Sequence, residues 1–162
     1  MEPCFFATFS KDEAVRLGSS SGGVFSELAS LILDRQGVVF GAKFDENYHV
    51  VHGFAQTPEE VQAFMGSKYV QSRTGGAYAQ AESFLRQGRQ VLYSGTPCQI
   101  AGLRAFLGRD EKNLLTVDIL CHGVPSQAMW SSYLAQRSQG KGVISVTFRD
   151  KTHCQQLKEN TS

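Results

Sequence analysis

Two stretches decide the fold class, "QVLYSGTPCQIAGLRAFLG" (90–108) and "LLTVDILCHGVP" (114–125). Each begins with an apolar run of strand-forming residues and reaches a cysteine, Cys98 or Cys121, beside glycine and proline. A helical pattern follows each apolar run, at 98–108 and at 125–138. Strands that alternate with helices predict parallel pairing through right-handed crossovers.

The N-terminal half adds antiparallel pairing to this sheet. "VVFGAKF" (38–44) and "HVVHGFA" (49–55), joined by "DENY", predict a hairpin. The fold class is therefore α/β, with a mixed, partly parallel sheet flanked by helices in a single domain. We expect further helices at 22–37, 57–64 and 75–88, a loop at 11–23, and strands at 4–9 and 142–150.

The run at 114–121 is almost continuously apolar, which predicts a strand covered on both faces. Asp118 lies inside this run, and a carboxylate buried there would need a partner. In sheets of this class the functional site lies at the carboxyl ends of the strands. We therefore expect Cys98 and Cys121 to lie at one rim of the sheet.

Composition excludes several classes of protein. The chain has 162 residues, and its 16 Lys and Arg nearly balance its 15 Asp and Glu, which gives no case for binding nucleic acid. No apolar run is long enough to span a membrane. The N-terminus "MEPCFFATFSKDE" lacks the features of a signal peptide, so we expect a cytoplasmic protein with reduced thiols.

Four cysteines in such a protein indicate metal binding, catalysis or simple packing. Soft thiolates suit iron–sulfur clusters, but Cys98 and Cys121 make only two of the four ligands that a cluster needs. Both cysteines could instead be small buried hydrophobic residues. Cys98 and Arg104 also have the C-x5-R spacing of phosphatases, although Ile100 and Leu103 would put bulk into a phosphate-binding loop.

Two polar loops are candidate phosphate or nucleotide contacts. "SSSGG" (19–23) opens a helix, where hydroxyls and free N–H groups favour an anion, with Ser21 as the expected N-cap. "GSKYVQS" (66–72) offers a positive charge, an aromatic ring and hydrogen bonds. Each loop also has an ordinary structural interpretation, as a serine cap or as a solvated turn. The candidate residues are Ser20, Ser21, Gly22, Gly23, Ser67, Lys68 and Tyr69.

Four blocks resemble the signature segments of the coenzyme F420 hydrogenase/dehydrogenase beta-subunit family. They are "LGSSSGGVFSELA", "GSKYVQS", "VLYSGTPCQIAGLRAFL" and "LLTVDILCHGVPS", in the family's order between Val15 and Asp150. The resemblance implies a flavin-binding α/β domain in which electrons pass between a 4Fe–4S cluster and FAD. It also implies a redox partner protein or a ferredoxin-type domain, and it leaves oligomer formation open.

The resemblance makes Cys98 and Cys121 candidate cluster ligands, and it places the two polar loops, with Thr96, at the cofactor. It implies a flavin and iron–sulfur domain over 1–150 and a tail without family counterpart over 151–162. The family's N-terminal C-x-x-C-x-x-C domain is absent from this sequence, and Cys4 and Cys154 have no assigned role. The competing hypothesis is a truncated, cofactor-free remnant or an interaction module.

Overall fold

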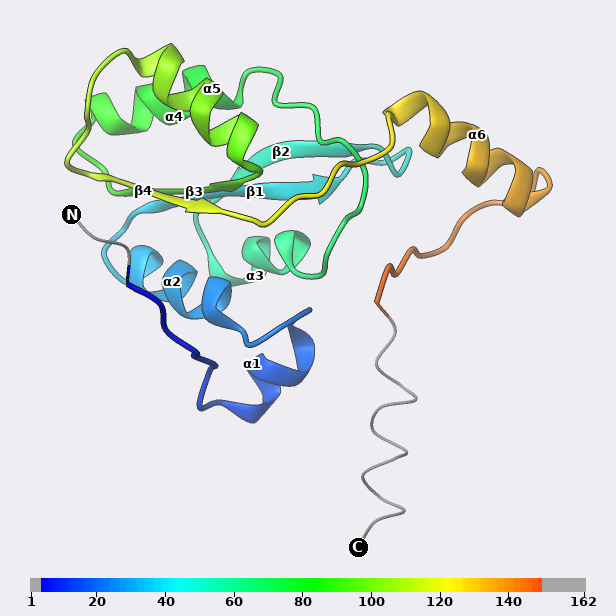
Figure 1. Ribbon diagram of the computed structural model, residues 1–162, viewed down its shortest axis with the longest axis horizontal. Coiled ribbons are helices and arrows are strands. Elements are labelled where there is room, and N and C mark those ends of the chain that lie inside the picture. The colour runs from blue at the N-terminus through cyan, green and yellow to red at the C-terminus, as the bar shows by residue number, and fades with distance from the viewer. Residues whose placement is uncertain (1–3, 150–162) are drawn as a thin grey trace, which may run out of the picture.

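The computed structural model describes residues 4–149 and contains one mixed four-stranded sheet (Figure 1). Its strand order is β2-β1-β3-β4. The β1–β2 pair is antiparallel, whereas β3 pairs in parallel with both β1 and β4. The predicted hairpin, the parallel pairing and the fold class are thus confirmed. The strands are β1 (Val38–Phe44), β2 (Val50–Ala55), β3 (Val91–Gly95) and β4 (Leu114–Asp118).

Alternating side chains of β1 and β3 build a core on each face of the sheet. Phe40 and Tyr93 pack under α4 and α5, while Val39 and Leu92 pack against α2, α3 and the short 3-10 helix η1 on the opposite face. Figure 1 shows the two helical layers on either side of the strands. These helices are α2 (Val24–Leu33), α3 (Pro58–Val61), η1 (Gln62–Phe64), α4 (Ala77–Arg86) and α5 (Pro97–Leu107).

The last helix, α6 (Gln127–Ser138), projects beyond the sheet at the hairpin end (Figure 1). It is anchored by Trp130, whose indole N–H donates a hydrogen bond to the carbonyl of Tyr48 at 2.7 Å. The ring of Trp130 also packs on Phe148, with 5.1 Å between ring centroids. Within residues 4–149, no helix has the length and hydrophobicity needed to cross a bilayer.

Three expected elements differ from the structure. The segments 4–9 and 142–149 are not strands, since neither finds a neighbouring strand to pair with, and Phe5 is 91% exposed. The expected loop 11–23 contains a short helix, α1 (Glu13–Gly18). The carboxylate of Asp12 caps this helix by accepting hydrogen bonds from the N–H groups of Ala14 and Val15 at 2.8 and 3.2 Å.

The expected burial of β4 on both faces is wrong. The strand lies at the edge of the sheet and ends at Asp118, three residues earlier than expected. Leu115 is 40% exposed and Leu120, beyond the strand, is 92% exposed. Asp118 is itself exposed, so its carboxylate needs no buried partner.

Candidate functional site

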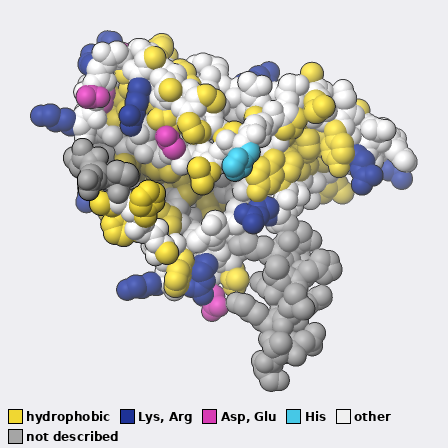
Figure 2. Space-filling view, viewed as in Figure 1, with side chains coloured by type: hydrophobic (Ala, Val, Ile, Leu, Met, Phe, Trp, Pro, Cys, Tyr) yellow, Lys and Arg dark blue, Asp and Glu magenta, His cyan; other side chains and the backbone are white. Residues whose placement is uncertain are grey.

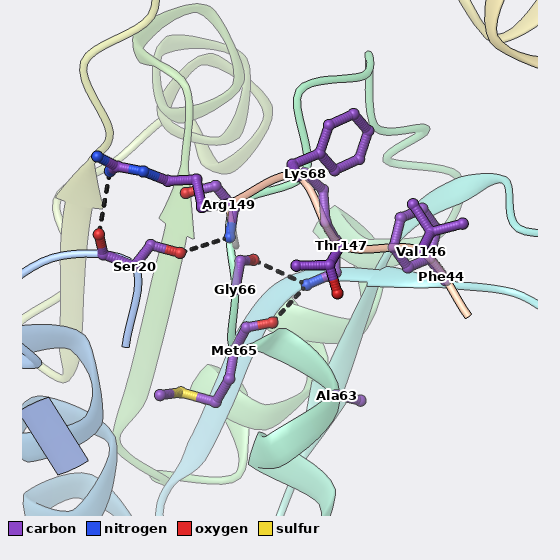
Figure 3. A pocket seen from close by; sticks show the side chains of 11 residues that line it. Ser20, Phe44, Ala63, Met65, Gly66, Lys68, Val146, Thr147 and Arg149 are labelled. Carbon is purple, nitrogen blue, oxygen red and sulfur yellow. Dashed lines mark hydrogen bonds between the residues drawn. The ribbon is translucent and has the colours of Figure 1, made fainter. Parts of the chain in front are cut away.

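A cavity of about 190 Å³ lies where four separate segments meet (Figure 3). They are the loop before α2, the end of β1, the segment after η1 and the segment 146–149. The structure therefore brings the two polar loops expected from the sequence to one place. Its lining includes Ser20, Phe44, Met65, Ser67, Lys68 and Arg149.

Hydrogen bonds join the segments around the cavity. The hydroxyl oxygen of Ser20 accepts a hydrogen bond from the backbone N–H of Ser67 at 2.7 Å. The guanidinium of Arg149 donates to the carbonyl of Ser20 at 3.0 Å (Figure 3). Ser20 thus holds both the second polar loop and the segment that closes the cavity.

Lys68 supplies a partly desolvated positive charge. Its Nζ donates to the carbonyls of Met65 and Gly66 at 3.0 and 3.1 Å, and it lies 5.8 Å from the centroid of the Phe44 ring. Burial lowers the pKa of Lys68 to about 8. An ammonium has three donors, so one remains for an anion after these two bonds.

The segment that closes the cavity was not identified from the sequence. Its anchor is Phe148, whose ring packs on Trp130. The Phe148 ring also meets the ring of Tyr69 edge-on, with 5.6 Å between the centroids. This anchoring brings Arg149 to the loop that carries Ser20. The sequence pattern predicted a strand at 142–150 and carried no signal for a contact across this distance along the chain.

The remaining residues of the first loop do not line the cavity. Ser21 is exposed, and the N-cap of α2 is Gly23 rather than Ser21. Close packing and backbone conformation explain both glycines without a ligand. A Cβ added at Gly22 would lie 2.9 Å from the carbonyl oxygen of Thr8. Gly23 has φ +84°, and a Cβ added there would lie 3.1 Å from Ser10 Cβ. Their contact with a phosphate stays a prediction. Tyr69 is 49% exposed and also lies outside the lining.

The two cysteines follow strands that end side by side. Gly95 at the end of β3 is paired with Asp118 at the end of β4, and Cys98 and Cys121 each follow three residues later. Both thiols are exposed, so they are not buried packing residues. Polar groups accompany each sulfur, since Thr96 Oγ1 lies 3.1 Å from Cys98 Sγ and the N–H of Gly123 donates to Cys121 Sγ at 3.4 Å.

These thiols fit only part of a cluster ligand set. Across residues 4–149, no three or more His, Cys, Asp or Glu side chains are grouped closely enough to hold a metal ion. A 4Fe–4S cluster bound by four thiolates would need ligands in addition to these two. Cys154, like the expected tail 151–162, lies outside the described residues.

The structure contradicts the phosphatase interpretation of Cys98 and Arg104. Cys98 and Arg104 both lie within α5, so the residues between them are helical and cannot wrap around a phosphate. The guanidinium of Arg104 is also engaged elsewhere, as a donor to the Thr116 hydroxyl at 2.9 Å.

A buried histidine connects the second polar loop to the end of β3, and no sequence pattern distinguished it from the rest of its strand. His52 Nδ1 is 2.5 Å from the hydroxyl of Ser72, and its Nε2 is 2.9 Å from the carbonyl of Ser94. Because a carbonyl can only accept, Nε2 carries the proton and Nδ1 accepts from Ser72. Burial lowers the pKa of His52, which favours this neutral form.

Hydrophobic side chains gather on the surface over α6 and the segment leading into it (Figure 2). They follow the exposed end of β4, next to the turn that carries Cys121. The exposed residues are Ile119, Leu120, Val124, Met129 and Tyr133.

The sequence and the fold both match known proteins. Two family profiles describe the N-terminal and the C-terminal part of the "Coenzyme F420 hydrogenase/dehydrogenase, beta subunit". Residues 5–77 match the N-terminal profile, and residues 88–161 match the C-terminal profile. No protein with a curated description matches the sequence.

Among solved structures, the fold resembles a chain of the F420-reducing [NiFe] hydrogenase complex from Methanosarcina barkeri, with a TM-score of 0.63 and 20% identity. The comparison covers 82% of the present chain and 49% of the hydrogenase chain, so the present chain spans about half of that relative's length. The expected resemblance is confirmed. Because the two profile matches together span most of the sequence, the chain belongs to the coenzyme F420 hydrogenase/dehydrogenase beta-subunit family.

Proposed function

We propose that the chain is a flavin-dependent electron-transfer domain that binds a phosphate group of FAD in the Lys68 cavity. Family membership supports an oxidoreductase-related role. The observation that carries the proposal is the meeting of Ser20, Ser67 and Lys68, from two distant polar loops, with Arg149 in one cavity.

The donor set of the cavity suits a phosphate. Lys68 and Arg149 are both cations that line it, and Lys68 is held in a partly desolvated position where charge–charge attraction is stronger than in water. The volume of about 190 Å³ is below the range of about 300–1,000 Å³ typical of sites that enclose a drug-sized ligand. The cavity would therefore hold one part of FAD, with the rest against the surface around it.

Cys98 and Cys121 are proposed as two thiolate ligands of a 4Fe–4S cluster. Their strands end at one edge of the sheet, both thiols are exposed, and a hydroxyl or an N–H group lies beside each sulfur. Such hydrogen bonds tune cluster potentials. The remaining ligands would come from outside the described residues, and the bound flavin would supply the exchange of electrons with the cluster.

A redox partner completes this proposal. The relative in Methanosarcina barkeri belongs to a hydrogenase complex. We propose that the present chain likewise exchanges electrons with a redox protein or a ferredoxin-type domain. The exposed apolar side chains around α6 instead favour an interaction module as the second candidate function.

A flavin titration tests the proposal. FAD fluorescence should change on binding, ADP should compete because it carries the phosphates, and riboflavin should not. Lys68→Met should weaken FAD binding about tenfold or more, because a charge-assisted hydrogen bond is lost. The exposed Lys112→Met is the matched control. Equal competition by riboflavin, or no effect of Lys68→Met, would refute the phosphate assignment.

Iron analysis tests the thiols separately. After anaerobic reconstitution, Cys98→Ser and Cys121→Ser should each lose bound iron, while Cys4→Ser should keep it, because serine is a poor ligand for iron–sulfur chemistry. Iron retained by both variants would reject the ligand roles. A chain that binds neither flavin nor iron, but binds another protein through the exposed apolar side chains around α6, would favour the interaction module.

A further inference from the structure

We infer that Gln99 is a positioning residue that couples the loop carrying Lys68 to the turn carrying Cys98. The inference deepens the function proposed above and rests on it for the identity of the ligand. It concerns how the flavin cavity and the thiol communicate, which neither the family match nor the likeness of fold describes.

Both ends of the Gln99 amide are in use, and they point to different segments. Its Nε2 donates to the carbonyl of Ser72, in the second polar loop, at 3.1 Å. Its Oε1 accepts from the N–H of Thr96, two residues before Cys98, at 3.1 Å. One side chain therefore bridges the loop and the turn directly.

His52 makes a second connection between the same segments. Its imidazole joins the Ser72 hydroxyl to the carbonyl of Ser94, and its backbone N–H donates to the carbonyl of Arg73 at 2.8 Å. Because Ser94 continues through Gly95 to the Thr96 turn, the two connections close a ring. Gln99 and His52 are its side-chain members.

Close packing leaves the ring little room to absorb a displacement. The His52 ring stacks on Tyr93, with 5.3 Å between centroids and 9° between planes. A Cβ at Gly95 would lie 3.2 Å from Gln99 Oε1 and 3.6 Å from His52 Nε2. Packed groups of this kind transmit small shifts rather than damp them.

The turn side of the ring reaches the thiol. Thr96, which donates its N–H to Gln99, also has its hydroxyl 3.1 Å from Cys98 Sγ. Tyr78 fixes the other side by donating its hydroxyl to the carbonyl of Gln99 at 2.9 Å. A shift of Thr96 would therefore change the hydrogen bonding and access of the sulfur.

The loop side of the ring reaches the cavity. Ser67 and Lys68 line it, and they lie only a few residues before Ser72 in the same loop. A ligand that binds Lys68 and displaces it would also displace the loop whose Ser72 carbonyl accepts a hydrogen bond from Gln99. The backbone from Lys68 to Ser72, followed by the hydrogen bonds of Gln99, thus connects the cavity to the Thr96 turn.

The test uses Gln99→Glu. Glutamate keeps an oxygen for the Thr96 N–H and is favoured at this third position of a helix, so α5 should remain intact. It removes the donor to Ser72 and places a carboxylate against that carbonyl. The readout is the rate of Cys98 alkylation by iodoacetamide, resolved by mass spectrometry and measured at one fixed pH below about 8, where Lys68 keeps its charge.

Saturating FAD should change this alkylation rate about fivefold in the unmodified chain, and the change should disappear in Gln99→Glu. Comparing each variant with and without FAD cancels the effect of the added charge. Gln127→Glu is the matched control, because Gln127 holds the same loop through the carbonyl of Gln71 without contacting the Thr96 turn. An equal response to FAD in Gln99→Glu, or none in the unmodified chain that binds FAD, would overturn the inference.

A double-mutant cycle measured without FAD tests the role of Gln99 independently of the flavin proposal. Ser72→Ala breaks the bond to His52 but keeps the carbonyl that Gln99 binds. Because Gln99→Glu removes the other connection, Ser72→Ala should change the Cys98 alkylation rate about twofold more in Gln99→Glu than in the unmodified background. If FAD does not bind at all, the proposed function fails, yet this cycle still decides the role of Gln99. Equal effects of Ser72→Ala in both backgrounds would reject it.

Discussion

The hydroxyl oxygen of Ser20 accepts a hydrogen bond from the backbone N–H of Ser67 at 2.7 Å, across 47 positions of sequence. This bond joins two loops that the sequence presented as separate phosphate-binding candidates. It makes Ser20 a determinant of the shape of the cavity as well as part of its lining.

Ser20→Ala should weaken FAD binding about fivefold, because one hydrogen bond of about 1 kcal/mol that orients the Lys68 loop is lost. Fluorescence titration measures the change. The neighbouring Ser21→Ala is the control, since Ser21 is exposed and outside the cavity. Equal effects of the two substitutions would show that the loop acts by general stability.

FAD binding should also weaken as pH rises through about 8. The pKa of Lys68 is lowered to about 8 by burial, so its ammonium is present below this value and is lost above it. An anion holds the proton on Lys68, so affinity should fall by up to about tenfold per pH unit above the pKa. Titrations across this range measure it.

Lys68→Arg provides the control for this pH dependence. Arginine stays charged throughout the range, so its FAD affinity should be nearly flat with pH, whatever its absolute value. A Lys68→Arg protein with the same fall above pH about 8 would assign the titration to another group.

Gly23→Ala should destabilise the fold by more than Gly88→Ala. Both glycines have positive φ, at +84° and +77°, which costs a residue with Cβ roughly 1–2 kcal/mol. Only at Gly23 does the added Cβ also meet neighbours, with Ser10 Cβ at 3.1 Å and Val15 Cγ1 at 3.2 Å. Urea unfolding measures both free energies, and equal losses would contradict the packing role of Gly23.

Acid should destabilise the protein partly through His52. Burial places its folded-state pKa below the ordinary value of 6.5, so the unfolded chain binds a proton that the folded chain does not. This contribution to stability is complete above pH about 6.5 and declines as pH falls toward the folded pKa.

The substitution His52→Gln should flatten this decline. Unfolding free energies from urea titrations between pH about 5 and about 8 give the comparison. An unchanged slope would indicate that other groups account for the acid sensitivity.

The sequence predicted the sheet well because its information is local. Alternating apolar residues and the turn at 45–48 specify the hairpin, and the regular spacing of strands and helices after Gln90 specifies parallel pairing. The errors arose where a segment's structure depends on a neighbour. The apolar run 4–9 has strand-forming residues but no partner strand, and nothing in the run at 114–121 indicated that β4 lies at an edge.

The lining of the candidate cavity was predicted only in part, because only some of its residues belong to local sequence patterns. Ser20, Ser67 and Lys68 belong to recognisable polar loops, whereas Arg149 lies in a segment that is anchored by the packing of Phe148 on Trp130. His52 and Gln99 look like ordinary members of a strand and a helix. Their roles come from hydrogen bonds to Ser72 that no short motif encodes.

The bond between Arg149 and the carbonyl of Ser20 joins residues 129 positions apart. During synthesis the hairpin can form once residues 38–55 have left the ribosome, and β3 can join β1 once residue 95 has left it. The cavity cannot close until Arg149 has emerged, because Arg149 is part of its lining. Contacts between residues distant in sequence also form late and slowly. A nascent chain would therefore carry a largely assembled sheet before it acquires a complete binding site, so a ligand of this cavity would be bound only after the whole described chain has been made.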